Sequence, residues 1–287
     1  MHYKEYKSIL SAKNNLNLFR GCTHGCIYCD SRSDCYQLNH PFEDIEIKKH
    51  ALEIFERELQ RKRQPCMITT GSMTDPYIQL EPRLRITRGA LELIERYEFG
   101  VAIQTKSTRI LRDLELLKQI NQKTKAVVEM TLTTYDEELC KILEPYVSTT
   151  KERFETLMQF KAAGVPTVVW LSPILPFIND SEENLRGILA YCIEAGVKAI
   201  MCFGFGVTLR AGNRESFYHQ LDKYFPGMKQ KYLSVFGDSY ICTSPQHDHL
   251  MALFSDTCKK HGILWKTEDV FQYLHTFEDK REQLSLF

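Results

Sequence analysis

Three cysteines lie close together near the start of the chain, in the stretch GCTHGCIYCD. Three residues separate Cys22 from Cys26, and two separate Cys26 from Cys29. Zinc ribbons use two separated C-x2-C pairs and bacterial ferredoxins use four cysteines before a proline, and this chain shows neither pattern. Buried cysteines that act only as small apolar side chains rarely gather beside two glycines in this way. Three thiolates can instead hold a [4Fe–4S] cube whose fourth iron is free to bind a small molecule.

An aromatic residue, Tyr28, precedes the last of these cysteines. The C-x3-C-x2-C spacing with this aromatic resembles the signature of the radical S-adenosylmethionine (SAM) superfamily. The resemblance implies that SAM chelates the open iron and that Tyr28 belongs to the cofactor site. It also implies that an electron, from a donor such as flavodoxin or ferredoxin, cleaves SAM, and that the resulting 5′-deoxyadenosyl radical abstracts hydrogen from a substrate.

A glycine and two hydroxyl residues follow an expected strand at residues 66–70, in the stretch TTGSMTDPYIQLEP. Gly71 lets a ligand approach the backbone, and Ser72 and Thr74 offer hydroxyl groups. An ordinary polar loop is the alternative interpretation. The superfamily has a glycine-rich motif at this strand end that holds the amino group of SAM, so the resemblance implies that these three residues contact the cofactor.

Two further polar residues end neighbouring strands. Lys106 follows an expected strand at residues 100–105, and Thr131 lies near the end of the next one. A lysine at a strand end is often only a solvated cation, but the resemblance makes the SAM carboxylate its expected partner. Thr131 is a further candidate for a cofactor contact at the same rim.

A narrower resemblance rests on several motifs that run in order from about residue 20 to residue 180: GCTHGCIYCDSR, GSMTDPYIQLE, TTYDEELCKILEP and AAGVPTVVWLSPILPFIND. They resemble the spore photoproduct lyase-like branch of the superfamily. The resemblance implies a nucleic-acid base or a DNA lesion as substrate. Two alternatives remain open: the same radical chemistry on a protein or small molecule, and a non-catalytic metal-bearing adaptor.

The chain departs from this branch at one position. The lyase has a catalytic cysteine at the end of its second strand, where this chain has Thr70 or Gly71. Cys66 stands at the start of that strand and is expected to point away from the site. Cys242, in SYICTSPQ, is the candidate for a catalytic hydrogen donor. The simpler interpretation is that Cys242 is a buried cysteine without a role.

The elements that must position these residues alternate along the chain. Short β-branched runs predict strands near residues 15–21 and at 66–70, 100–105, 126–134, 166–174 and 197–205. Amphipathic runs between them predict helices, such as residues 181–196 with a serine cap and a glycine stop. About six parallel βα units predict an α/β fold, a partial (β/α)6 TIM barrel with its ligand at the carboxyl ends of the strands.

The pattern changes after residue 206, where two further helices are expected. We expect a radical SAM partial barrel, a C-terminal helical cap and a flexible tail over residues 1–206, 207–278 and 279–287. His247 and His249 lie two positions apart on the second helix and therefore point to different sides. We expect both to be surface residues and not a metal-binding pair.

The chain ends in QLSLF, residues 283–287. This peptide resembles the motif by which bacterial DNA polymerases and repair proteins dock on the sliding clamp. Leucine and phenylalanine would fill an apolar pocket while glutamine bonds to its rim. The alternative is a tail that folds onto its own domain.

The composition excludes some classes of function but does not identify one. The 37 basic and 37 acidic residues cancel, which argues against bulk electrostatic binding to a nucleic-acid backbone. The start, MHYKEYKSIL, lacks the apolar segment of a signal peptide, and no apolar run is long enough for a membrane span. We therefore expect a cytoplasmic protein with reduced cysteines, and the seven cysteines outside the first motif show no spacing for a second cluster.

Overall fold

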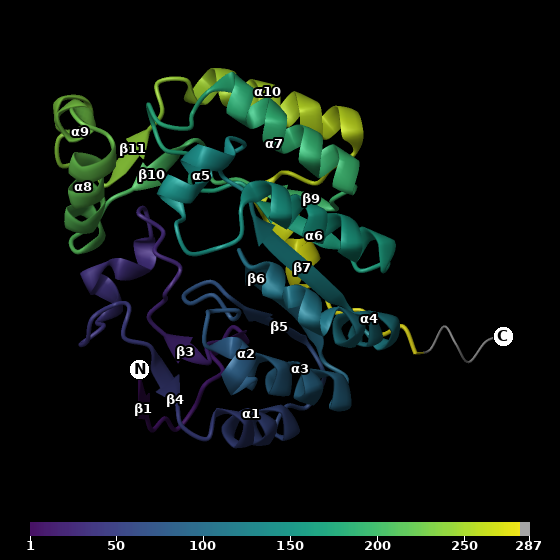
Figure 1. Ribbon diagram of the computed structural model, residues 1–287. Helices are drawn as coiled ribbons and strands as arrows, with labels where there is room; N and C mark the ends of the chain where they lie inside the picture. Colours follow the sequence, from purple (N-terminus) through teal and green to yellow (C-terminus); the bar gives the residue numbers. More distant parts are fainter. Residues whose placement is uncertain (282–287) are drawn as a thin grey trace.

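The computed structural model describes residues 1–281, and within that range six parallel strands form the main sheet (Figure 1). Their order is β2-β5-β6-β7-β8-β9, which is also their order along the chain. The edge strands β2 and β9 do not pair with each other, so the barrel stays open. The predicted partial barrel is confirmed. The strands are Asn15–Leu16, Met67–Thr70, Gly100–Thr105, Ala126–Thr131, Thr167–Trp170 and Ala199–Met201.

Helices cover the outer face of this sheet and bury its β-branched side chains in the largest core cluster. Helix α7 shows why the sequence pattern was informative. The Ser181 side chain accepts a hydrogen bond from Asn184 N, and Gly196 ends the helix in the left-handed region at φ 63°. The outer helices are α1 (Ala51–Gln60), α3 (Ile86–Arg96), α4 (Leu114–Lys123), α6 (Thr150–Ala162) and α7 (Glu182–Ala195), with two shorter ones at α2 (Glu81–Leu84) and α5 (Glu137–Leu143).

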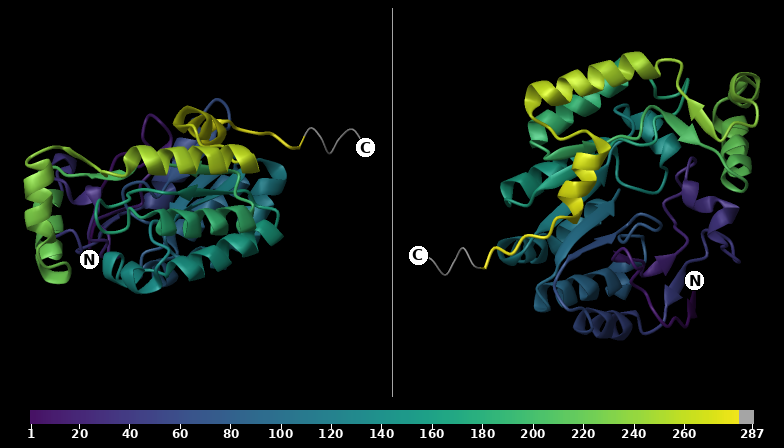
Figure 2. Two further views of the ribbon diagram at one scale, coloured as in Figure 1. Left: turned by 90° about the horizontal axis from the view of Figure 1, so that it is seen from above. Right: turned by 180° about the vertical axis from the view of Figure 1, so that it is seen from behind.

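The inner face of the sheet is covered by the last helix, α11 (Thr267–His275). Val270 and Leu274 pack on inward-facing residues of the sheet strands. Lys125, just before β7, donates from Nζ to the carbonyl oxygens of Tyr273 at 2.8 Å and Thr276 at 3.1 Å. The right-hand view of Figure 2 shows α11, in yellow, crossing the open side of the barrel. A helix therefore fills the interior near the amino ends of the strands.

The region expected to form a helical cap divides into two parts. Helix α10 (His247–His261) packs beside α7, and both α10 and α11 belong to the barrel. The part that stands over the barrel consists of the antiparallel strands β10 (Gly206–Thr208) and β11 (Ile241–Thr243) with α8 (Asn213–Tyr224) and α9 (Met228–Phe236) between them. The expected helices are present, and the two-stranded sheet is an addition to them. The sequence pattern does not reveal it because each strand has only three residues.

A second small sheet, which the sequence analysis did not predict, lies at the amino end. It consists of β1 (His2–Lys4), β4 (Glu46–Lys48) and β3 (Phe19–Arg20) in the order β1-β4-β3. Strand β3 leads directly into the cysteine segment, so this sheet holds one end of it. Every helix within residues 1–281 is too short or too polar to span a lipid bilayer.

The start of the expected tail is held against the barrel. Lys280 N donates to Lys123 O at 3.0 Å, and the Arg281 guanidinium pairs with Glu98. Residues 279–281 are therefore tied to the body of the protein, unlike the free segment expected from the sequence. The predicted clamp-binding peptide, residues 283–287, lies outside the described residues.

Candidate active site

The cysteine segment is a loop held by its backbone. Cys22 N donates to Phe42 O at 3.0 Å, and Ile27 N donates to Leu143 O at 3.0 Å. Gly21 has φ 81°, and a Cβ built there would lie 2.4 Å from Phe42 O, so only glycine fits this close approach. The loop is therefore fixed both at its entry and in its middle, as a rigid metal-binding loop requires.

The three thiols lie near enough for the charge of Cys29 to act on both Cys22 and Cys26. Cys22 and Cys26 are buried and Cys29 is half-buried. Burial, together with the nearby charges of Asp75 and Cys29, raises the pKa of Cys22 to about 12. Burial also raises the pKa of Cys26 well above 9. Because thiolates in this place need compensating positive charge, the thiols fit a metal cluster and do not fit free nucleophiles.

A cavity of about 570 Å³ opens beside Cys26 and Cys29. It lies at the carboxyl ends of the strands, where the sequence analysis placed the ligand. The barrel contributes the residues that follow β6, β8 and β9. The antiparallel strand pair β10–β11 closes the opposite side. The lining includes Tyr28, Ser72, Gln104, Lys106, Trp170, Ser172, Phe203, Tyr240, Ile241, Thr243 and His247.

Lys106 extends from the end of β6 into this cavity. Its Nζ lies 5.8 Å from the centre of the Tyr28 ring. Burial on its own lowers the pKa of Lys106, but the negative charges of Cys26 and Glu144 raise it above its ordinary value. Lys106 is therefore a positive charge held beside the cysteine loop, and an anionic group of a ligand is its natural partner.

A buried ionic network lies beneath the loop. Tyr28 Oη and Arg153 Nη2 both donate to the Glu144 carboxylate. Arg153 also donates to Thr131 O at 2.9 Å and to Ser148 O at 2.7 Å. Burial alone raises the pKa of Glu144, but Arg153 and Lys106 lower it below its ordinary value, so the carboxylate is ionised. The network fixes the hydroxyl end of Tyr28, which lies between Cys26 and Cys29 in the sequence.

The sequence pattern did not reveal Glu144 or Arg153. Neither residue lies at the end of a strand: Glu144 follows α5, and Arg153 lies in α6. A buried arginine at a core position of an amphipathic helix is the one feature that could have revealed them, because such a charge requires a partner.

The glycine-rich loop lies where it was predicted, with its residues in different roles. Gly71 has φ 103°, and a Cβ there would lie 2.0 Å from Gln104 O, so glycine lets the loop pass against β6. Ser72 lines the cavity, and its Oγ accepts a hydrogen bond from Asn15 Nδ2 at 2.8 Å. Asp75 ties the loop to β6 by accepting from Lys106 N at 2.7 Å.

Thr74 and Thr131 do not line this cavity. Thr74 is buried and borders a separate cavity beside Met73. Thr131 is buried in β7, and its Oγ1 has no hydrogen-bond partner in the part of the chain that is described. Neither residue lines the cavity beside Cys26 and Cys29, and their expected contacts with the cofactor stay predictions.

The Cys242 side chain points away from the cavity, so it is badly placed for a catalytic hydrogen donor. Ile241 and Thr243 line the cavity, whereas Cys242 between them is completely buried against Phe217 and Tyr232. Alternate residues of a strand face opposite sides, so a strand that presents its neighbours to the cavity must turn Cys242 away. The position fits the simpler interpretation of a buried core cysteine.

The prediction for the two histidines holds for only one of them. His249 is exposed and pairs with Glu182 at 2.7 Å. His247 lines the cavity, and its Nδ1 accepts a hydrogen bond from Phe205 N at 3.2 Å. Gly204 makes room for this ring, since a Cβ there would lie 2.8 Å from His247 Cε1.

Aromatic rings form one wall of the cavity and continue out of it. The ring centres of Trp170 and Phe203 are 5.6 Å apart, and those of Phe203 and Phe271 are 6.2 Å apart. Phe203 is 56% exposed, which is unusual for a large apolar side chain beside a cavity. Trp170 is held by a hydrogen bond from its Nε1 to Glu129, whose pKa burial raises to about 7.

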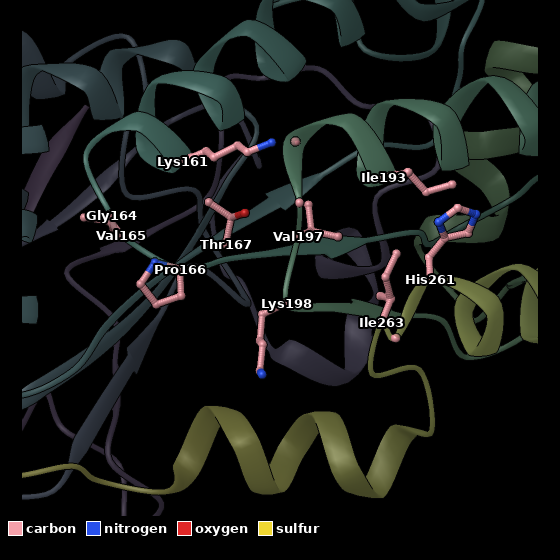
Figure 3. Close-up of a pocket in the computed structure, with 13 residues that line it drawn as sticks. Lys161, Gly164, Val165, Pro166, Thr167, Ile193, Val197, Lys198, His261 and Ile263 are labelled. Carbon is pink, nitrogen blue, oxygen red and sulfur yellow. The ribbon is translucent and has the colours of Figure 1, made fainter.

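A second cavity, of about 510 Å³, lies at the opposite ends of the strands (Figure 3). It is bordered by Thr167 and Lys198 at the amino ends of β8 and β9, and by the carboxyl ends of α6, α7 and α10. Figure 3 shows apolar side chains such as Val197 and Ile263 around it. It is remote from the cysteine loop and brings together no comparable set of reactive groups.

Comparison with known proteins decides the family. A model of the radical SAM superfamily matches residues 16–189, which include all three cysteines of the loop. The chain belongs to the radical SAM superfamily. It is therefore an enzyme that uses SAM and a [4Fe–4S] cluster, and the alternative of a non-catalytic adaptor is not retained.

Relatives with similar sequences carry no functional name. An uncharacterized protein of Mycobacterium tuberculosis is 28% identical over 235 residues, which cover 79% of this chain and 68% of the relative. An uncharacterized protein of Methanocaldococcus jannaschii is 27% identical over 220 residues, which cover 76% of this chain and 78% of the relative.

Solved structures share the fold of this radical SAM protein. Spore photoproduct lyase complexed with dinucleoside spore photoproduct has a TM-score of 0.59 at 15% identity, covering 86% of this chain and 74% of the lyase. SuiB of Streptococcus suis bound to its precursor peptide SuiA has a TM-score of 0.51 at 16% identity, covering 92% of this chain and 48% of SuiB. These identities are low, so they support the fold, and the substrate must be argued from the cavity.

Proposed function

We propose that this radical SAM enzyme abstracts a hydrogen atom from a base or base lesion in a nucleic acid. When bound, the cluster and SAM supply a 5′-deoxyadenosyl radical for that step. Cys22, Cys26 and Cys29 hold the cluster. Lys106 binds the SAM carboxylate, and Ser72 on the loop after Gly71 lies where the amino group is bound.

The observation that carries the proposal is the exposed aromatic wall beside the cysteine loop. Phe203 presents more than half of its surface next to Trp170. Tyr240, just before β11, is 46% exposed and also lines the cavity. Flat heterocycles stack on such rings with about 1–3 kcal/mol per base. The wall therefore fits a nucleobase presented to the space above Cys26 and Cys29.

One further fact supports the choice of substrate, and a second constrains how the substrate would bind. The lyase that shares this fold binds a dinucleoside lesion. The chain has no net charge to attract a nucleic-acid backbone, so stacking and recruitment must supply the affinity. The sequence QLSLF would provide that recruitment through the sliding clamp, in a cytoplasmic setting.

The direct test follows hydrogen from the substrate to the cofactor. The anaerobically reconstituted enzyme is given SAM, a reductant and oligonucleotides deuterated in their bases, with and without ultraviolet damage. Deuterium in the 5′-deoxyadenosine product, measured by mass spectrometry, supports the proposal. Cleavage of SAM without deuterium transfer from any oligonucleotide, together with transfer from a deuterated peptide pool, would instead favour a peptide substrate like that of SuiB.

A further inference from the structure

A cluster of potential metal ligands lies on the small amino-terminal sheet, outside the cavity described above. One ligand atom from each of His2, His40 and Asp44 lies within 4.8 Å of the others. Glu46 of β4 adds a second carboxylate, with its Oε2 3.7 Å from His2 Nε2 and 3.7 Å from His40 Nε2. These residues come from β1, from the loop after the cysteine segment, and from β4.

The ring of His40 has a nitrogen, Nε2, that is available to bind a metal ion. Its Nδ1 lies 3.0 Å from Pro41 O, and since a carbonyl oxygen can only accept, Nδ1 carries the proton. The lone pair is therefore on Nε2, which points towards Glu46. The side chain is only 9% exposed, and Nε2 has no hydrogen-bond partner in the described chain. A buried imidazole nitrogen with a free lone pair needs a hydrogen-bond donor or a metal ion to offset its loss of water.

The ring of His2 shows the same arrangement. Its Nδ1 lies 2.9 Å from Asp44 Oδ2 and donates to that carboxylate, which leaves the lone pair on Nε2. An imidazole that binds metal with one nitrogen almost always donates from the other to a carboxylate or carbonyl, which fixes the tautomer. Asp44 and Pro41 O provide these two outer partners.

Glu46 supplies the negative charge. Its side chain is completely buried, and Tyr6 Oη donates to Oε1. Oε2 makes no hydrogen bond with residues 1–281, although Lys4 Nζ forms an ion pair with it at 3.2 Å. Lys4 is 43% exposed, so its ammonium group can turn to solvent when a doubly charged ion takes its place.

We propose that His2 Nε2, His40 Nε2 and Glu46 Oε2 bind a divalent transition-metal ion, with zinc as the best match. Two imidazoles and one carboxylate are a donor set that zinc accepts, with water as the fourth ligand. Tetrahedral ligands about 2.0–2.1 Å from zinc lie about 3.4 Å apart, close to the 3.7 Å that separates Glu46 Oε2 from each of the two imidazole Nε2 atoms. The site is separate from the cluster cysteines and independent of the proposed substrate.

A metal bound at this site would help to fix the position of the cysteine loop. His40 and Asp44 flank Phe42, whose carbonyl oxygen accepts the hydrogen bond from Cys22 N and touches Gly21. A metal held by His40, His2 and Glu46 fastens this short loop to β1 and β4. It thereby fixes the backbone that positions the first cluster cysteine.

The test measures metal binding without SAM or substrate. The enzyme with its [4Fe–4S] cluster in place is equilibrated with Zn²⁺, desalted and analysed for zinc. We expect about one tightly held zinc per chain in the wild type, and binding weakened by at least ~10-fold in His40→Gln and in His2→Gln. His219→Gln, at an exposed histidine on α8, is the matched control and should bind zinc like the wild type.

Cobalt distinguishes this site from vacant cluster cysteines. Co²⁺ at two histidines and a carboxylate gives visible ligand-field bands without thiolate charge-transfer absorption. Zinc binding that is unchanged in both histidine variants would overturn the proposal, as would cobalt spectra dominated by thiolate. His2 is 39% exposed, so His2→Gln tests the site even if His40→Gln disturbs folding. Circular dichroism of each variant checks that the fold is kept.

Discussion

Arg153 and Glu144 form an ion pair that is completely buried directly beneath the cysteine loop. The pair joins α6 to the segment after α5, and Tyr28 adds its hydroxyl to the same carboxylate. Part of the electrostatic environment of the cofactor cavity is therefore set by Arg153 and Glu144, neither of which lines the cavity. Lys106 experiences this environment, since the Glu144 charge helps to keep it protonated.

Replacing Glu144 with glutamine should strongly destabilise the protein. The change leaves the buried Arg153 charge without its partner, and breaking a buried pair costs about 3–5 kcal/mol of unfolding free energy. Denaturant unfolding of the apoprotein measures this loss. Lys141→Met, at the exposed Lys141–Glu138 pair, is the control and should change stability little. Equal effects of the two substitutions would show that the buried pair is not structurally important.

The same pair predicts a dependence on pH. Because the folded-state pKa of Glu144 lies below its ordinary value of 4.5, its stabilisation is complete above about pH 4.5 and is lost as pH falls through the folded-state pKa. Glu144→Gln should lose less stability than the wild type over this acid range. Unfolding curves at several pH values compare the two, and parallel acid profiles would contradict the assignment.

Replacing Lys106 with methionine should weaken SAM binding while leaving the cluster in place. The lost interaction is a charge-assisted hydrogen bond, worth about 1.5–3 kcal/mol, or a rise in Kd of roughly 10- to 150-fold. Lys106→Arg should restore part of the affinity. Iron content and the change of the cluster's electron paramagnetic resonance signal on SAM addition provide the two readouts. An unchanged Kd would exclude Lys106 as the carboxylate ligand.

Truncating Phe203 to alanine should separate SAM cleavage from substrate binding. The radical site stays intact, so 5′-deoxyadenosine still forms without substrate, but the stacking surface is lost. We expect KM for the nucleic-acid substrate to rise roughly 5- to 150-fold, as one lost stacking contact predicts. Leu233→Ala, at another exposed apolar residue on α9, serves as the comparison. If both variants keep the wild-type KM, the aromatic wall does not bind the substrate.

Cys242→Ala should retain the full yield of product. Its thiol lies in the core between the strand pair β10–β11 and the helices α8 and α9. The substitution should therefore lower thermal stability and leave the chemistry unchanged. Product analysis under single-turnover conditions and a melting curve separate these effects. A stable variant that cleaves SAM but no longer completes turnover would restore Cys242 as the hydrogen donor.

Removing residues 283–287 should abolish capture by the bacterial sliding clamp without changing SAM cleavage. The expected reason is the loss of the leucine and phenylalanine that would fill the clamp pocket. A pull-down with purified clamp compares the intact and shortened chains. Persistent capture of the shortened chain would place any clamp contact elsewhere.

The sequence predicted features that depend on local spacing. The cysteine spacing identified the loop, and strand-end positions identified Ser72 and Lys106, because side chains after parallel strands converge at one edge. Long-range packing was not predictable in the same way. Val270 and Leu274 mark α11 as amphipathic, but nothing in the pattern says that its apolar face meets the inside of the barrel.

The orientation of side chains was a second feature that the sequence could not predict. Cys242 lies in a strand of three residues, and only its pairing with β10 decides which side faces the cavity. The ion pair of Arg153 and Glu144 joins two segments with no common periodicity. His40 and His2 are 38 positions apart and meet only through the small amino-terminal sheet.

The placement of α11 gives the barrel a floor. A molecule that reaches the space above Cys26 cannot pass through the interior and must leave by the mouth through which it entered. A nucleic acid, the substrate proposed above, would then have to present a base turned out from its own stack. The cost of extruding that base would favour damaged or unpaired positions, so access alone would make the enzyme selective.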